Sequence, residues 1–334
     1  MSAYTTASSQ DAPFLDLHRA MGHLNVGTMR QIITHDLIAN MPDVTKILRK
    51  SCPCGACLIS KYCNKHPRPF PATHSKEATP PNHTWYADFF GPISPASIHG
   101  DRVVLVLVDR RTGYVVAVPL RSKDACVAAI VAHLAWSRQF EHVQGNSLPR
   151  LVRSDGEPVL CSEELQRAVG NNVTMQQSPP YTPELNGPAE AGVRSVKMFT
   201  TTYLLSGRLS PTYWNYSSIK AASTLNLQPG QGMNPKISRY EALCGKPPQF
   251  HELCAFGALV IVGNPHHTFL KPRALLAVYL APNPVQPRSH FLLLLNNLKP
   301  ISSFQFKVVP GGLWFDQSMV VEFYPQRLQQ LQYL

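Results

Sequence analysis

A run of six apolar residues at positions 103–108, VVLVLV, restricts the fold more than any other stretch of the sequence. A strand that is apolar on both faces has to be covered on both faces, which is typical of a central strand in an α/β sheet. Other segments with strand character lie at 83–90, 113–120, 148–154 and 172–177, and segments with helical character at 124–140, 162–169, 188–206 and 211–227. Three strands in a meander, followed by alternating helices and strands, predict an α/β domain with a mixed sheet.

Changes of composition along the chain predict four segments. Residues 14–66 carry apolar residues at helical spacing, broken by two glycines, and predict a small helical unit. The proline-rich segment 67–82 is typical of a stiff linker. The α/β core occupies 83–230, and short apolar runs between proline and glycine turns predict a small β-rich module at 235–325.

The net charge of +11 is distributed unevenly. Residues 1–80 carry 9 basic and 5 acidic side chains, residues 81–189 carry 9 and 10, and residues 190–334 carry 13 and 5. We therefore expect a polyanionic partner, contacted mostly by the two ends of the chain, with a basic surface that only aids solubility as the alternative. No membrane partner is expected, because the longest aliphatic run, FLLLL at 291–295, is far shorter than the roughly 20 residues that cross a bilayer.

Two close pairs of metal-binding residue types lie in the N-terminal unit. His18 and His23 are separated by four residues and Cys54 and Cys57 by two, with thirty residues between the pairs. Zinc prefers thiolate and imidazole ligands in a tetrahedral arrangement, and metal binding would stabilise the thin core of so small a unit. The four residues therefore predict one structural Zn²⁺ site, whereas solvent-facing histidines and apolar cysteines without a metal are the alternative. Spare ligand candidates in the same unit are Cys52, Cys63, His35 and His66. Cys52 in place of Cys54 is the foremost of these alternatives.

Three carboxylates occupy positions in the predicted elements that could bring them together. Asp88 lies inside the first strand of the core, Asp155 ends the fourth strand, and Glu190 lies near the start of the helix at 188–206. Clustered carboxylates repel each other unless cations neutralise them. Two divalent ions roughly 4 Å apart would do so, and would also activate a nucleophile and stabilise a leaving oxygen at phosphorus. For any one of these residues a solvent-facing charge is the simpler interpretation, but the three together favour a catalytic site.

The remaining acidic residues near strand ends or in loops, which are expected in turns or in solvent, are Asp101, Asp109, Glu157 and Glu184.

The helix expected over 188–206 has one charged face and one apolar face. Glu190, Arg194 and Lys197 share the charged face. The opposite, core-facing stripe consists of Ala189, Val193, Val196 and Thr200. An acidic residue beside two phosphate-seeking cations is typical of a helix laid along DNA, although an ordinary i,i+4 pair of Glu190 with Arg194 would use the same residues.

Together, these motifs resemble the integrase of copia-type long-terminal-repeat retrotransposons, a relative of retroviral integrases. LHRAMGHLN and CGACLISKYCNKHPRPF resemble the family's His-His-Cys-Cys segment. WYADFFGPI, VLVLVDRRTGYVVAVPL, VRSDGEPVL and SPPYTPELNGPAEAGVRSVK resemble its catalytic core, and RYEALCGKPPQFHELCAFGALVIV resembles the sequence that follows the core. The resemblance covers nearly the whole chain, from about 14 to 315.

The resemblance implies a ribonuclease H-like core with a zinc-binding N-terminal domain. It implies that Asp88, Asp155 and Glu190 form a catalytic triad that binds two Mg²⁺ or Mn²⁺ ions. The implied activity is that of a polynucleotidyl transferase that joins the ends of the element's DNA to target DNA, and the same site could trim the 3′ ends with water as nucleophile. The implied ligands of the single structural Zn²⁺ are His18, His23, Cys54 and Cys57.

The resemblance also implies partners and a location. The partners are DNA, as element ends and as target, and further copies of the chain, because both DNA ends must be joined together. The expected DNA contacts are Tyr181, Asn186, Arg194 and Lys197. The expected location is the nucleus, with a cytoplasmic particle stage if the chain is part of an active element.

Some positions depart from the family pattern. Asp155 and Glu190 are separated by 34 residues, where the family usually has 35. Ala191 occupies the position of a basic residue, and Gly156 and Glu157 occupy the positions of an Asn-Gly pair. These departures leave a second hypothesis open, in which a degenerate or domesticated copy retains DNA binding as a scaffold without catalysis. A cut-and-paste transposase would share the chemistry but not the His-His-Cys-Cys unit and the linker.

Overall fold

The structure of the chain is a computed structural model. It describes residues 12–48, 51–52, 54–61, 79–177, 187–230, 234–250, 253–264, 268–269, 272–316 and 320.

A five-stranded mixed sheet forms the centre of the core. Its strands are β1 (Thr84–Phe90), β2 (Val103–Asp109), β3 (Val115–Leu120), β4 (Leu151–Ser154) and β5 (Thr174–Gln177). In the order β3-β2-β1-β4-β5, the first three strands are antiparallel neighbours, whereas β4 pairs in parallel with both β1 and β5. The predicted mixed α/β sheet is confirmed, and β2 is buried along its whole length, as its apolar sequence requires.

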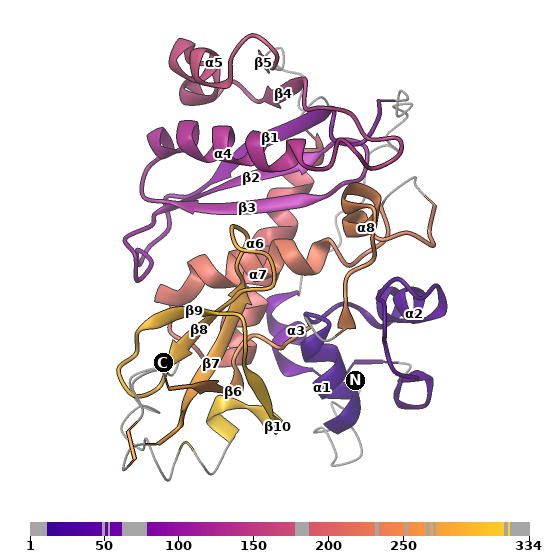
Figure 1. Cartoon of the computed structure of the whole chain (residues 1–334), viewed down its shortest axis with the longest axis vertical. Helices are drawn as coiled ribbons and strands as arrows, with labels where there is room; N and C mark the ends of the chain where they lie inside the picture. Colours follow the sequence, from indigo (N-terminus) through magenta and orange to yellow (C-terminus); the bar gives the residue numbers. More distant parts are fainter. Residues whose placement is uncertain are drawn as a thin grey trace.

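Helices cover both faces of this sheet (Figure 1). The core helices are α4 (Cys126–Arg138), α5 (Glu163–Val169), α6 (Gly187–Gly207) and α7 (Trp214–Leu225). Because side chains alternate along a strand, Trp85 and Ala87 of β1 pack with α4 and α5, whereas Tyr86 and Phe90 pack with α6 and α7. The α6 side of β1 is therefore the side that carries Asp88.

The N-terminal unit contains three short helices, α1 (Ala12–Ala20), α2 (Val26–Thr34) and α3 (Gly55–Ser60). The sequence predicted two short helices with a loop between them at Gly22 and Gly27, and α1 and α2 confirm the two helices. Gly22 lies in the loop at a φ of 69°, whereas Gly27 lies in the first turn of α2, which Asn25 caps by accepting a 2.9 Å hydrogen bond from the Thr28 N–H. Cys54 directly precedes α3, and Cys57 lies in its first turn.

The C-terminal module is an antiparallel sheet of five strands in the order β10-β6-β7-β8-β9. The strands are β6 (Ala258–Gly263), β7 (Ala274–Pro282), β8 (His290–Leu294), β9 (Pro300–Ser303) and β10 (Lys307–Leu313). The short helix α8 (Arg239–Cys244) precedes them. The 3₁₀ turns are η2 (Thr45–Ile47), η3 (Lys123–Ala125), η4 (Pro158–Cys161), η6 (Pro211–Tyr213) and η8 (Trp314–Asp316). The predicted β-rich character of this part is confirmed.

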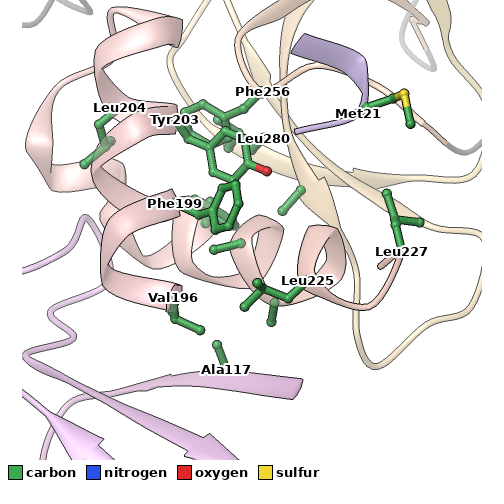
Figure 2. Packing of buried hydrophobic residues seen from close by; sticks show 14 of the residues in the cluster. Met21, Ala117, Val196, Phe199, Tyr203, Leu204, Leu225, Leu227, Phe256 and Leu280 are labelled. Carbon is green, nitrogen blue, oxygen red and sulfur yellow. The ribbon is translucent and has the colours of Figure 1, made fainter. Parts of the chain in front are cut away.

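One hydrophobic cluster joins the N-terminal unit, the core and the C-terminal module. Helices α6 and α7 lie at its centre, between the core sheet and the other two parts (Figure 1). Figure 2 shows Tyr203 of α6 beside Phe256, with Leu280 of β7 and Met21 of the α1–α2 loop in the same cluster. Since burial of apolar surface is the main favourable contribution to folding, the three parts stabilise one another through α6 and α7.

None of the helices in the described part of the chain combines the length and the apolar character that a membrane crossing requires. The 21-residue helix α6 is long enough, but its solvent-facing side is charged.

Candidate active site and metal centre

Strand pairing brings Asp88 and Asp155 to neighbouring points of the sheet. In the parallel pair of β1 and β4, Ala87 lies opposite Ser154. Asp88 directly follows Ala87, and Asp155 directly follows Ser154. Because the two strands are parallel, the backbone continues in the same direction at both positions, and Asp88 and Asp155 lie side by side. Asp88 is half-buried within β1, whereas Asp155 is exposed just beyond the end of β4.

Close packing of α6 on the sheet brings the third carboxylate to the same region. A Cβ atom on Gly192 would lie 2.7 Å from Cγ2 of Val108, so glycine allows α6 to approach β2 closely. In the register of the sheet, Asp88 pairs with Val106, which also faces Gly192. Glu190, which is exposed in the first turn of α6, therefore lies above the part of β1 that carries Asp88.

The electrostatics of Asp88 show that these carboxylates share one region. Burial raises the pKa of Asp88 to about 6, and a 2.6 Å hydrogen bond from the Phe89 N–H opposes this shift. The negative charges of Asp155, Glu190 and Glu157 raise the pKa of Asp88 further. A divalent cation would relieve this repulsion, and carboxylate oxygens are the ligands that Mg²⁺ and Mn²⁺ prefer.

The carboxylates are near one another without forming a preassembled ion site. Within the described residues, the group of His, Cys, Asp and Glu side chains that gathers closely enough to hold an ion lies in the N-terminal unit and not at Asp88. Among the same residues, no hydrogen bond or ion pair fixes the exposed carboxylates of Asp155 and Glu190. Both side chains can therefore change rotamer toward a cation at Asp88.

The cations predicted on α6 lie beside this region. Arg194 and Lys197 are exposed, and Nζ of Lys197 lies 5.2 Å from the ring centroid of Phe90, two residues after Asp88. The opposite stripe is buried as predicted, at Ala189, Val193, Val196 and Thr200. The two other expected DNA contacts, Tyr181 and Asn186, lie outside the described residues.

Two further charged residues at this site were not recognised in the sequence. Glu157 was expected in solvent, but it is half-buried and its Oε1 lies 2.5 Å from Nζ of Lys123. Lys123 also lies over the ring of Phe89, at 5.7 Å from the centroid. The one feature of the sequence that could have indicated Glu157 as a site residue is its position two residues after Asp155. Nothing in the sequence indicates its pairing with Lys123, which is 34 positions away. Asp109 does behave as a turn residue, since it is buried and accepts the Thr112 N–H at 2.7 Å.

The raised pKa of Asp88 gives a pH-dependent prediction for the metal-free protein. Below about pH 4 the Asp88 carboxyl is protonated in both the folded and the unfolded chain, and above about pH 6 it is ionised in both. Because burial disfavours the ionised carboxylate, its ionisation lowers the free energy of unfolding of the wild type. The Asp88→Asn variant should therefore gain stability over the wild type as the pH rises from about 4 to about 6, and keep that advantage to pH 8. Urea unfolding across this range measures the difference in the free energy of unfolding; a difference that stays constant from about pH 4 to about pH 6 would contradict the prediction.

The four predicted zinc ligands come together in the N-terminal unit. The ligand atoms of His18, His23, Cys54 and Cys57 all lie within 4.8 Å of one another. Nε2 of His18 lies 3.2 Å from the Cys57 sulfur, and Nδ1 of His23 lies 3.4 Å from the Cys54 sulfur and 3.6 Å from the Cys57 sulfur. With the usual Zn–N and Zn–S bond lengths, a tetrahedral site has N···S edges of about 3.5 Å. The four residues could therefore hold one Zn²⁺ ion.

The protonation of two of these residues suits a metal. Burial lowers the pKa of His23 to about 4, so its imidazole is neutral at physiological pH and has a lone pair to donate. Contacts with the thiols of Cys52 and Cys57 lower the pKa of Cys54, which favours its thiolate, whereas contacts with Cys52 and Cys54 raise the pKa of Cys57. Lys61 donates a hydrogen bond to the carbonyl oxygen of His23, next to these sulfurs.

The His-His-Cys-Cys group is docked on α6 and α7 of the core. Nζ of Lys61 lies 4.5 Å from the ring centroid of Phe199, and the Tyr203 hydroxyl donates to the carbonyl oxygen of Gly22 at 3.2 Å. The Tyr203 hydroxyl also lies 2.5 Å from the hydroxyl of Thr224. Nothing in the sequence indicates this contact, because its residues are up to 181 positions apart.

The five-stranded mixed sheet with helices on both faces defines a ribonuclease H-like core, and a His-His-Cys-Cys unit is docked on it. No family model matches the sequence. The chain is 24% identical over 240 residues to the retrovirus-related Pol polyprotein from transposon RE2 of Arabidopsis thaliana, covering 72% of this chain and 16% of the polyprotein. It is 29% identical over 171 residues to the Pro-Pol polyprotein of feline foamy virus, covering 51% of this chain and 14% of that protein. The resemblance is confirmed: the chain is similar to the integrase region of copia-type retrotransposon Pol polyproteins.

The chain spans about a sixth of the length of the plant polyproteins that it matches. Among solved structures, the catalytic core domain of HTLV-2 integrase, determined in complex with magnesium, aligns with a TM-score of 0.35 and 23% identity. That alignment covers 49% of this chain and 97% of the viral domain.

Proposed function

We propose that this chain is a retrotransposon integrase that joins the ends of element DNA to target DNA by metal-dependent transesterification. The observation that carries the proposal is the shared electrostatic field of Asp88, Asp155 and Glu190, which come from β1, the end of β4 and the start of α6. Acidic side chains whose negative charges raise the pKa of Asp88 are suited to divalent cations, and the similarity to integrase regions agrees with this use.

In this proposal Asp88, Asp155 and Glu190 are the residues that would hold two Mg²⁺ or Mn²⁺ ions. When bound, such ions activate the attacking oxygen and stabilise the leaving oxygen of an in-line displacement at phosphorus. The 3′-hydroxyl of an element end attacks a target phosphodiester, so that one P–O bond forms, one breaks, and the proton passes from the attacking to the leaving oxygen. With water as nucleophile, the same residues would support trimming of the 3′ ends.

The exposed cations on α6 support a role in binding DNA beside the carboxylates. Arg194 and Lys197 would neutralise phosphates of the element end and position it over Asp88. Tyr181 and Asn186 remain expected contacts of the same strand. Since two element ends have to be joined together, the active form would be a homo-multimer, and it would act in the nucleus after a cytoplasmic particle stage.

A strand-transfer assay tests the proposal. The chain is incubated with an oligonucleotide duplex that carries the element's terminal sequence, a supercoiled target plasmid, and Mg²⁺, Mn²⁺ or EDTA. We expect joined products with either metal and none with EDTA. Salt-sensitive DNA binding without joining in either metal would instead identify the chain as an inactive integrase-derived scaffold.

A further inference from the structure

A fifth metal-binding side chain lies against the His-His-Cys-Cys group. The sulfur of Cys52 is 3.3 Å from Nε2 of His18, almost the same distance as the Cys57 sulfur from that atom. The Cys52 thiol also shifts the pKa values of Cys54 and Cys57, so it lies near both sulfurs. Cys52 therefore lies against His18 and near two further donors of the group.

The one donor that Cys52 does not contact is His23. Through Nδ1, His23 contacts Cys54 and Cys57, and its ring lies edge-on to that of His18 at a centroid separation of 4.9 Å. In the described part of the chain, the donors that all lie close to one another are His18, His23, Cys54 and Cys57. Cys52 adjoins this group at His18, where it could complete a set of four donors in place of His23. The sequence had suggested Cys52 as a replacement for Cys54, whereas these contacts make it the alternative to His23.

The surroundings fit a third thiolate. The ammonium group of Lys61 interacts with the sulfurs of Cys57, Cys54 and Cys52, most strongly with Cys57. Two thiolates balance the charge of a divalent ion, and a third leaves a net negative charge that this ammonium group offsets. Thiolates are also strong ligands of Zn²⁺ and Co²⁺, so the exchange of an imidazole for a thiolate keeps the tetrahedral preference of the ion.

We propose that Cys52 is a fifth donor of the metal centre, which takes the fourth coordination position in place of His23. The chain then has two interchangeable ligand sets for one ion, one with two sulfurs and one with three. This inference is independent of the proposed strand transfer, because it concerns the N-terminal unit alone.

Co²⁺ binding to the full chain tests the proposal, with the His23→Asn variant as the key protein. Asparagine tolerates the positive φ of 60° at this position and is a poor ligand of Co²⁺. The variant should keep tetrahedral Co²⁺ absorption, with affinity within about tenfold of the wild type. The intensity of its sulfur-to-cobalt charge-transfer band should be about 1.5 times that of the wild type. This is the ratio of three Co–S bonds in the variant to two in a wild type that binds through two sulfurs.

A double-mutant cycle separates this proposal from simple tolerance of the His23 change. The Cys52→Ser variant should also bind within about tenfold, but the double variant His23→Asn/Cys52→Ser should lose at least about 100-fold in affinity, as should Cys57→Ser. Cys161→Ser, at an exposed cysteine in η4, is the matched control and should bind as the wild type does. If His23→Asn alone loses as much affinity as the double variant, Cys52 is not a ligand.

A second measurement covers the case in which the His23→Asn variant does not fold. In the wild-type chain, Zn²⁺ should slow the alkylation of Cys52 by iodoacetamide, while Cys161 reacts at an unchanged rate. Equal rates at Cys52 with and without Zn²⁺ would overturn the proposal.

Discussion

The Asp155→Asn variant is expected to lose strand joining by at least about 10³-fold while its DNA affinity stays within about twofold of the wild type. Asparagine has nearly the same volume as aspartate, so the backbone beyond β4 and its pairing with β1 should persist. The change removes one negative charge from the group around Asp88 and with it a ligand of the proposed ions. Joining is measured with labelled element ends, and DNA affinity by fluorescence anisotropy at several salt concentrations.

The matched control is Glu141→Gln, which neutralises an exposed acidic residue after α4, away from these carboxylates. Its strand joining should equal that of the wild type. Retention of joining in the Asp155→Asn variant would remove Asp155 from the catalytic residues.

The Gly22→Ala variant should be the most damaging small substitution in the N-terminal unit, with a loss of about 3 kcal/mol or more in the free energy of unfolding. Gly22 has a φ of 69°, and an added Cβ would lie 2.3 Å from both the Thr224 Oγ1 and the Tyr203 hydroxyl. Both neighbours are buried on α7 and α6, so neither can yield without displacing the zinc-binding unit. Urea unfolding and limited proteolysis measure the loss.

Gly55→Ala is the matched control in the same unit, because Gly55 has open space at its Cβ position and no positive φ. Its free energy of unfolding should change by less than about 1 kcal/mol. If Gly22→Ala were as stable as this control, the close docking of the α1–α2 loop on α6 and α7 would be wrong.

The parts of the fold that the sequence predicted are those set by local periodicity. The apolar run of β2 and the alternation of helices and strands after the first three strands predicted the mixed sheet. The two-sided pattern of α6 gives its buried stripe and its exposed cations. The gathering of His18, His23, Cys54 and Cys57 was predictable because ligand type and spacing are chemical requirements, which do not depend on packing.

The parts that the sequence did not predict depend on contacts between distant residues. The pair of Lys123 with Glu157 joins η3 to the chain after β4, and the hydroxyl contact of Ser60 with Thr202 joins α3 to α6 across 142 positions. The six-residue helices α3 and α8 are too short for a periodic pattern. The place of Cys52 against His18 likewise follows from the docking of the cysteine segment on α1 rather than from its spacing.

The most direct test of the central claim is the position of bound Mn²⁺ in crystals of the chain, determined by anomalous scattering. The account predicts two peaks roughly 4 Å apart, with Asp88 and Asp155 bound to the ions and Glu190 bound to one of them. Crystals that hold Mn²⁺ elsewhere, with none at the carboxylates of Asp88, Asp155 and Glu190 at saturating metal, would contradict it.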